Sequence, residues 1–212
     1  MCLAALQPLR DCCELIVVDG GSMDNTKSLA KPLADKVIPS GKGRAIQMNV
    51  GAENAVGNIL IFLHADTFLP QDALMHINNA INNNGQWGRF DVKLSGCHPM
   101  LKMIAWFMNW RSRLTAIATG DQVIFVKKKL FESVGHYPVI PLMEDIALCK
   151  KLKKISPPAC LTAKVTSSGR RWERFGVFRT ILLMWRLRLG YFLGEDPQTL
   201  AFLYNEGHKW KP

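Results

Sequence analysis

Short apolar runs alternate with amphipathic segments along most of the chain. Residues 14–19 and 59–64 are rich in branched apolar side chains and end at polar positions, as buried parallel strands do. Between them, apolar residues recur at the three- and four-residue spacing of helices. The alternation predicts an α/β fold with a mostly parallel sheet flanked by helices.

The same patterns give the remaining elements. Further strands are expected at 36–39, 87–95, 122–126 and 159–166. Helices are expected at 24–34, 44–56, 70–83, 99–118, 127–134, 142–154, 173–193 and from Pro197 onward, and residues 2–9 have the pattern of the last turns of a helix. With no internal repeat or linker, residues 1–212 are expected to form a single domain with a helical C-terminal region.

Composition narrows the class of partner. Hydrophobic residues make up 48% of the 212 positions and charged residues 21%, which is typical of a globular chain. The 27 Lys and Arg against 17 Asp and Glu give a net charge of +10 and favour an anionic partner such as a nucleoside diphosphate or an acidic lipid. No nucleic-acid partner is expected, because the basic residues do not alternate with base-stacking aromatics.

Cysteine usage and charge placement bear on location. The six cysteines contain no CxxC pair and follow no signal peptide, so we expect reduced thiols and a cytoplasmic protein. We expect no membrane-spanning helix, because cations interrupt the two longest apolar stretches at Lys102, Arg111, Arg113, Arg179, Arg186 and Arg188.

Three acidic clusters follow strands or begin a helix: Asp19 with Asp24, Asp66, and Glu144-Asp145. Ligands of open α/β sheets bind beyond the carboxyl ends of the strands, so the first two clusters are expected to line one crevice. The structural alternative for each is a helix cap, a turn or a favourable helix N-terminus.

Two further features are candidates for binding a diphosphate. Asp66 closes a very apolar strand and suits a hard cation whose shell the diphosphate completes. Lys42 and Arg44 lie between and after glycines just before a helix, where backbone N–H groups and cationic side chains both meet phosphate. His64, at the end of the same strand as Asp66, is a candidate ligand or a hydrogen-bonded structural residue.

Five ordered blocks resemble family 2 glycosyltransferases with the Rossmann-related GT-A fold, and in particular an uncharacterised bacterial subgroup. The resemblance covers residues 13–204. The blocks are ELIVVDGGSMDNT, GRAIQMNVGAENAVGNILIFLHADT, GDQVIFV, IPLMEDIALCKKL and RRWERFGVFRTILL.

The resemblance implies a role for each matching residue. Asp19, with Gly20 and Asp24, matches the loop that contacts the nucleoside, and Asp66 matches the last acid of the DxD metal motif, which binds Mg²⁺ or Mn²⁺. Asp145, beside Glu144, matches the catalytic base. Arg171 and Trp172 resemble an RW pair that borders the acceptor and the diphosphate.

The sequence departs from the family pattern in three places. His64 stands where the first acid of DxD is expected, and the usual arginine of the preceding helix is replaced near Met48, with Arg44 as a substitute. The resemblance also predicts an upstream strand between the strands at 14–19 and 59–64. We therefore expect an unfilled central position there and a native gene product that starts further upstream.

The resemblance implies a metal-dependent, inverting enzyme that transfers a sugar from a nucleotide-sugar donor to an acceptor hydroxyl. Residues 1–96 would then bind the nucleotide, residues 97–170 the acceptor, and residues 171–212 would form the C-terminal helices. A sugar-phosphate nucleotidyltransferase and an inactive binding protein remain as alternatives. The apolar and basic pattern of residues 173–193 favours either a peripheral membrane contact or packing on the core.

Overall fold

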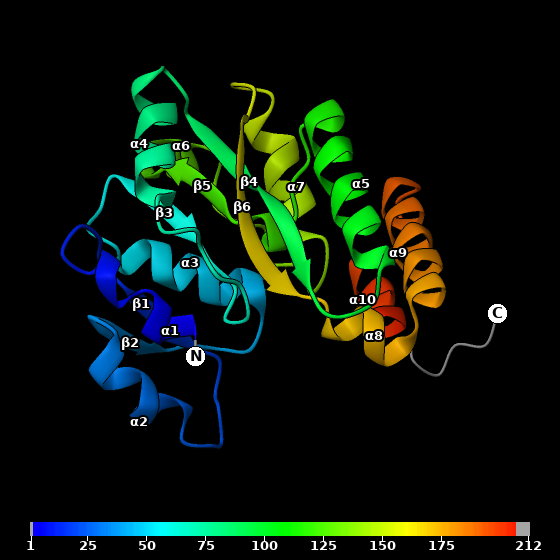
Figure 1. Cartoon of the computed structure of the whole chain (residues 1–212), viewed down its shortest axis with the longest axis horizontal. Coiled ribbons are helices and arrows are strands. Elements are labelled where there is room, and N and C mark those ends of the chain that lie inside the picture. Colours follow the sequence, from blue (N-terminus) through cyan, green and yellow to red (C-terminus); the bar gives the residue numbers. More distant parts are fainter. Residues whose placement is uncertain (1, 207–212) are drawn as a thin grey trace.

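A computed structural model describes residues 2–206 of the chain (Figure 1). The strands of this part are β1 (Ile16–Asp19), β2 (Lys36–Pro39), β3 (Ile59–Phe62), β4 (Trp87–Ser95), β5 (Ile124–Lys127) and β6 (Ala159–Ser168). The α-helices are α1 (Cys2–Ala5), α2 (Thr26–Ala30), α3 (Arg44–Asn54), α4 (Ala73–Asn82), α5 (Met100–Thr115), α6 (Lys128–Ser133), α7 (Glu144–Leu152), α8 (Arg170–Phe175), α9 (Val177–Phe192) and α10 (Pro197–Glu206).

The α/β class is confirmed, with more antiparallel pairing than the sequence pattern predicts. β1 and β2 form a parallel pair, and a second sheet has the order β3-β5-β4-β6. β4 and β6 are parallel, whereas β5 runs antiparallel to both β3 and β4. Two of the four strand pairs are therefore antiparallel, because β5 enters the sheet in the opposite direction.

The larger sheet is buried on both faces. In β5, Ile124 and Val126 pack into a cluster with α3, α6 and α7, while Phe125 packs on the other face with residues of α4 and α5. All three side chains are fully buried. The continuous apolar sequence of β5 follows from this position, since no face of the strand meets water.

The small sheet is a separate unit. Among the described residues β1 pairs with β2 alone and β3 pairs with β5 alone, so β1 and β3 are not bonded to each other, as the expected unfilled position requires. Helix α3 packs on β1, where a Cβ added at Gly51 would lie 3.2 Å from Val18, and Gln47 Nε2 donates to the Val18 carbonyl at 3.1 Å. α3 is thus a main connection between the two sheets (Figure 1).

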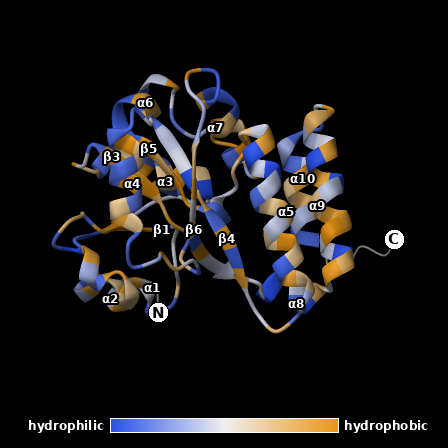
Figure 2. Ribbon diagram, turned by 45° about the horizontal axis from the view of Figure 1, so that its top comes forward, coloured by the Kyte–Doolittle hydropathy of each residue, from blue (hydrophilic) through white to orange (hydrophobic). Residues whose placement is uncertain are grey.

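The C-terminal region contains one more break than expected. A single helix was predicted over 173–193, but the structure has α8 and α9 separated at Gly176, whose φ of 84° lies in the left-handed region. α5, α9 and α10 stand beside the sheet (Figure 2). Within residues 2–206, no helix is both long and apolar enough to cross a bilayer. Residues 207–212 of the predicted C-terminal helical region lie outside the described residues.

Candidate functional site

Three segments distant in sequence meet around Gly120. The Gly120 amide donates to Asp145 Oδ2 at 2.8 Å, which fixes the start of α7 against the short turn before β5. A Cβ built at Gly120 would lie 2.2 Å from His64 Nε2 and 3.1 Å from Asp145 Oδ2. Glycine is therefore the residue that lets the segment after β3 and the start of α7 approach this closely. The structure thus brings together His64 and Asp145, both predicted site residues.

The acidic pair Glu144-Asp145 is buried at the start of α7. Glu144 is 2% exposed and Asp145 is 8% exposed. Burial raises the pKa of Glu144 to about 7, and the neighbouring Asp145 charge acts in the same direction. Burial also raises the pKa of Asp145 to about 6, although the Gly120 amide opposes the shift. Because their pKa values lie near neutral pH, these two carboxyls can each gain or lose a proton there, which suits them to proton transfer.

Arg44 is the cation that faces this pair. It begins α3, and its Nη1 lies 3.9 Å from Glu144 Oε1. Burial acts to lower the pKa of Arg44, but interactions with Tyr204, Glu144 and Asp145 outweigh it and raise the pKa. Arg44 therefore stays charged beside the acids.

Replacing Glu144 with glutamine tests this electrostatic environment. At about pH 8 the Glu144→Gln variant should be about 3 kcal/mol more stable to unfolding than the wild type. Because the pKa of Glu144 is about 7 in the folded chain against an ordinary 4.5, the folded state holds a proton that the unfolded state has released. Stability conferred by this proton is present below pH 4.5 and is lost as the pH rises through 7. Chemical denaturation at about pH 5 and pH 8 measures the difference.

The matched control is Glu53→Gln, which removes an exposed carboxylate from α3. Its free energy of unfolding should follow that of the wild type at both pH values. A gain from Glu144→Gln that is equal at both pH values, or absent at pH 8, would contradict the raised pKa.

His64 joins a small polar cluster that sequence reasoning did not identify. Burial lowers the pKa of His64, and the nearby Asp121 charge acts in the opposite direction. Asp121 Oδ1 accepts a hydrogen bond from Ser167 Oγ at 2.9 Å, and Ser167 Oγ lies 3.2 Å from Thr67 Oγ1. The sequence did contain one signal for this cluster. In the block GDQVIFV, Gly120 and Asp121 come directly before an apolar strand.

Asp66 lies on the exposed turn after β3. Its Oδ2 is 3.7 Å from Arg170 Nη2, and its side chain is 47% exposed. Among the described residues no group of three or more His, Cys, Asp or Glu side chains could hold a metal ion. Mg²⁺ is commonly bound through one or two carboxylates plus substrate phosphates, so a single accessible carboxylate such as Asp66 fits a cation shared with a diphosphate.

Asp19 organises the loop after β1. Its carboxylate accepts from the amides of Gly21 and Ser22 and lies 3.3 Å from Lys27 Nζ. The Ser22 side-chain hydrogen bond is the largest of the contacts that lower the pKa of Asp19 to about 2. Asp19 is therefore ionised at neutral pH, and its oxygens hold the backbone of Gly21 and Ser22 in place.

Asp24 and Lys42, the other predicted binding residues near the Asp19 loop, make few contacts with the rest of the protein. Asp24 accepts hydrogen bonds from the Thr26 amide and hydroxyl, but the N-cap of α2 is Asn25, so Asp24 forms a local turn before the helix rather than its cap. Lys42 is exposed on the loop between β2 and α3. No contact within the described part of the chain joins Asp19 or Asp24 directly to the Gly120 cluster. α3 links the two regions, because Arg44 faces Glu144 while Gln47 contacts Gly20 and Val18.

Arg171 and Trp172 lie on α8 and contact the C-terminal helices and the core. Arg171 Nη2 donates to the Tyr204 carbonyl at 2.7 Å, and its guanidinium lies 3.7 Å from the centre of the Tyr204 ring. Trp172 packs against the cluster that contains α5. Arg170, rather than Arg171, faces Asp66. In this arrangement Tyr204 of α10 lies between Arg171 and the Arg44 region.

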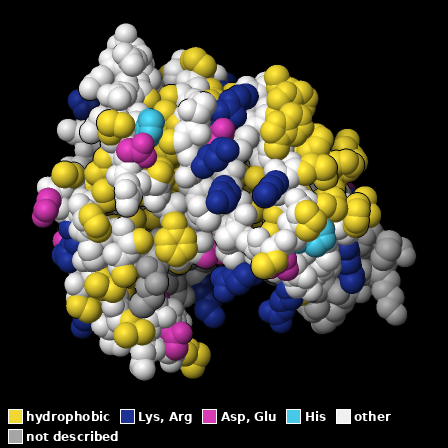
Figure 3. Space-filling model, in the orientation of Figure 1, with side chains coloured by type: hydrophobic (Ala, Val, Ile, Leu, Met, Phe, Trp, Pro, Cys, Tyr) yellow, Lys and Arg dark blue, Asp and Glu magenta, His cyan; other side chains and the backbone are white. Residues whose placement is uncertain are grey.

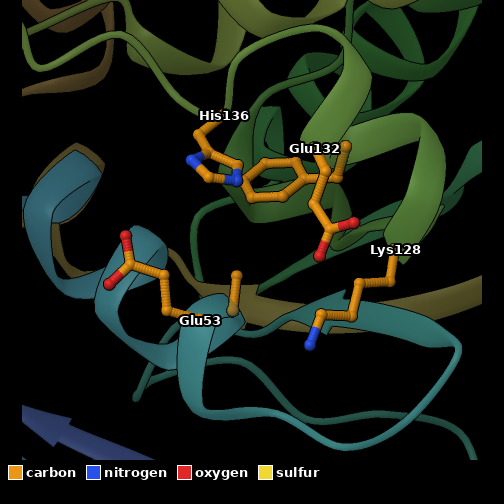
Figure 4. A pocket seen from close by; sticks show the side chains of 6 residues that line it. Glu53, Lys128, Glu132 and His136 are labelled. Atoms are coloured by element: carbon orange, nitrogen blue, oxygen red, sulfur yellow. The ribbon is translucent and has the colours of Figure 1, made fainter.

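A pocket of 360 Å³ lies elsewhere, between α3 and α6 (Figure 4). Its charged lining is Glu53, Lys128, Glu132 and His136, and Lys128 Nζ donates to the Ala55 carbonyl at 2.5 Å. None of the predicted site residues, all of which lie in the described part of the chain, lines this pocket. The candidate site therefore consists of two parts. One is the Gly120 cluster, formed by Gly120, His64, Glu144, Asp145 and Arg44, and the other is the Asp19 loop that follows β1.

Comparisons with known proteins bear on the family and the fold of the chain. The sequence pattern of glycosyl transferase family 2 matches residues 2–128. An uncharacterized glycosyltransferase of Haemophilus influenzae is 29% identical over 93 residues, which are 38% of this chain and 37% of that protein. This chain therefore matches little more than a third of the length of that curated relative.

Two solved structures share the fold. The mannosyltransferase PcManGT from Pyrobaculum calidifontis, in complex with GDP-Man and Mn²⁺, superposes with a TM-score of 0.58 at 19% identity, over 94% of this chain and 61% of that chain. Glucosyl-3-phosphoglycerate synthase from Mycobacterium tuberculosis, in complex with Mg²⁺ and UDP, superposes with a TM-score of 0.55 at 16% identity, over 78% of this chain and 63% of that chain.

Proposed function

Because the chain belongs to glycosyl transferase family 2, we propose that it transfers a sugar from a nucleotide-sugar donor to an acceptor hydroxyl, with inversion at the anomeric carbon. The observation that carries the proposal is the buried Asp145, whose raised pKa of about 6 lies close to neutral pH. A carboxylate of this kind removes a proton more effectively than an exposed one while still being ionised in most molecules at pH 7.

Asp145 is the proposed general base. It takes the proton of the acceptor hydroxyl as that oxygen attacks the anomeric carbon and the bond to the donor diphosphate breaks. A single displacement of this kind inverts the configuration. Glu144 is the proposed partner of Asp145, because burial and then the charge of the adjacent Asp145 raise the pKa of Glu144.

Asp66 is the residue proposed to hold a divalent cation, Mg²⁺ or Mn²⁺, together with the donor diphosphate. When bound, such a cation offsets the negative charge that develops on the departing diphosphate. The solved relatives that contain GDP-Man with Mn²⁺ or UDP with Mg²⁺ support this choice of donor and ion. The accessible carboxylate of Asp66 supports it independently.

The remaining binding roles are proposed from the family resemblance. We assign the nucleoside to the loop held by Asp19, with Gly20 and Asp24, and the diphosphate to Lys42, Arg44 and His64. Arg171 and Trp172 would border the acceptor through α8. The division into a nucleotide half at 1–96, an acceptor half at 97–170 and C-terminal helices at 171–212 is proposed for ligand binding alone, since β3 and β4 share one sheet with β5 and β6.

The test is incubation of the chain with UDP- and GDP-sugars, with and without Mn²⁺, and analysis of the products. Release of a nucleoside diphosphate supports sugar transfer, whereas release of pyrophosphate would identify a nucleotidyltransferase and overturn the proposal. Tight nucleotide binding without any turnover across donors and acceptors would support the inactive binding protein instead.

The Asp66→Ala variant should lose Mn²⁺-dependent nucleotide binding, because its carboxylate is the proposed protein ligand of the cation. Calorimetric titration of UDP and GDP in the presence of Mn²⁺ should show at least a tenfold weaker affinity. The control is Asp11→Ala, which removes an exposed carboxylate before β1 and should bind as the wild type does. Equal affinities of Asp66→Ala and wild type would remove Asp66 from the metal site.

A further inference from the structure

The outer sides of α5 and α9 are apolar where a globular protein normally places polar residues. Six aromatic side chains define this aromatic face: Trp106, Phe107 and Trp110 of α5, and Phe178, Trp185 and Phe192 of α9. Each of them is between 50% and 70% exposed. A surface helix of a globular protein ordinarily has its apolar stripe toward the core and charged residues opposite.

Helix spacing explains why these side chains share one side. Phe178, Trp185 and Phe192 are seven residues apart along α9, and seven residues make almost two full turns. The inner side of each helix is already satisfied, since Ile104 and Ala105 of α5 and Val177 of α9 are buried in one cluster. Core packing therefore accounts for the inner stripes. On the aromatic face, Lys150 of α7 lies 4.7 Å from the centre of the Phe192 ring, while the rings of Trp106, Phe178 and Trp185 remain exposed.

The face is continuous across the two helices. α5 and α9 stand side by side (Figures 1 and 2), and Figure 3 shows apolar side chains gathered over them. Within α5, the ring of Trp106 lies 5.0 Å from that of Phe107 and is stacked 6.1 Å from that of Trp110. An exposed patch of this kind is a mark of an interaction surface.

Charge indicates the kind of surface that it meets. α5 and α9 contain no Asp or Glu, whereas α5 carries Lys102, Arg111 and Arg113, and α9 carries Arg179, Arg186 and Arg188. Lys102 is exposed, Arg186 is exposed and pairs with Glu195, and Arg113 is exposed and pairs with Asp91. Arg111 and Arg188 are partly buried. Aromatic rings flanked by cations on an interfacial helix are suited to the boundary between lipid headgroups and acyl chains, where the cations meet anionic headgroups.

We propose that the aromatic face of α5 and α9 binds the surface of an anionic lipid bilayer. A second copy of the chain is the less favourable occupant, because a symmetric dimer through this face would bring two sets of acid-free basic helices together in a chain of net charge +10. An anionic bilayer instead offers an apolar layer for the rings and an opposite charge for the exposed Lys102 and for the net positive charge of the chain. The surface lies outside the Gly120 cluster, so its function is separate from the proposed sugar transfer.

The test uses the whole chain and vesicles of phosphatidylcholine with or without about one-third phosphatidylglycerol. Sedimentation at low salt should carry the protein down with the anionic vesicles and leave it in solution with the neutral ones. Each basic residue near the surface contributes about a fivefold factor to partitioning, and this contribution falls as salt screens the charges. Quenching of tryptophan fluorescence by brominated lipid should accompany binding and locate the rings in the interface.

The Trp106→Gln/Trp185→Gln variant should bind anionic vesicles at least tenfold more weakly, since both rings are exposed and their loss leaves the core unchanged. The control is Val56→Gln/Val139→Gln, which alters apolar side chains that are 79% and 68% exposed and lie outside α5 and α9. The control should bind as the wild type does.

Two results would overturn the proposal. One is equal recovery of wild type and tryptophan variant with anionic vesicles. The other is a dimer, detected by sedimentation velocity, that the tryptophan variant abolishes while neither protein binds vesicles. The second result would assign the face to another copy of the chain.

Discussion

Replacing Asp145 with asparagine is expected to lower turnover about 100-fold or more and to leave nucleotide binding unchanged. Asparagine keeps the shape of the side chain, and its carbonyl oxygen can still accept the hydrogen bond that the Gly120 amide donates to Asp145. What it loses is the ability to take a proton. Because that proton is removed only as the acceptor attacks, the loss should fall on the rate of transfer rather than on donor affinity.

The measurement combines initial rates with a titration of the nucleoside diphosphate. In the wild type the rate should rise with pH through about 6, where Asp145 loses its proton, and this rise should be missing from the residual activity of the variant. The control is Asp72→Asn, which changes an exposed carboxyl before α4. Full turnover by Asp145→Asn would show that another group is the base.

A methyl group at Gly120 should destabilise the folded chain by about 3 kcal/mol, the upper end of the usual cost of overpacking. The added Cβ would lie 2.1 Å from His64 Cε1, a distance at which one of the two groups must move. The imidazole is confined between Gly120 and neighbouring acids, so the displacement should also disturb Asp145. Chemical denaturation of Gly120→Ala gives the change in the free energy of unfolding.

Removing the imidazole provides the internal check. The Gly120→Ala/His64→Ala double variant should recover most of the stability lost in Gly120→Ala, because the clashing ring is absent. Gly57→Ala is the control, since its added Cβ would meet the Ile59 carbonyl oxygen at an ordinary 3.6 Å. Additive costs of the two single substitutions would mean that His64 and residue 120 do not compete for the same space.

The positions of helices and strands could be predicted from the local sequence pattern. The pairing of strands and of buried charged side chains could not. The strands at 36–39 and 87–95 have the predicted bounds, because turn residues flank both runs. The alternating sequence of residues 87–95 is typical of a half-buried strand, yet the first six residues of β4 are all buried. Arg89 explains part of the difference: it lies inside the protein, where it pairs with Asp91 and donates to the Asn109 carbonyl. A charged residue in a sequence pattern cannot reveal a partner that the fold supplies.

The candidate site shows the same division. Glu144 and Asp145 could be proposed from their position at a helix start, and the structure adds their burial, which depends on packing against segments far away in sequence. Gly120 and Asp121 have no individual signal in the sequence beyond the block GDQVIFV. Their importance comes from contact with His64 and Ser167, which the fold supplies. The contact of Arg170 with Asp66 could not be predicted from sequence either. Arg170, and not the neighbouring Arg171, lies on the side of α8 that faces Asp66.

The separation of the two sheets divides the chain into regions that need not unfold together. β1 pairs with β2, and its Val18 carbonyl also accepts from Gln47 of α3, so these strands can leave α3 without breaking any pair in the four-stranded sheet. Local opening of this kind requires less free energy than global unfolding. The Asp19 loop belongs to the region that opens, and a nucleotide bound there would stabilise it by RT ln(1 + [L]/Kd). Donor binding would then determine how much of the time the nucleotide half is fully assembled.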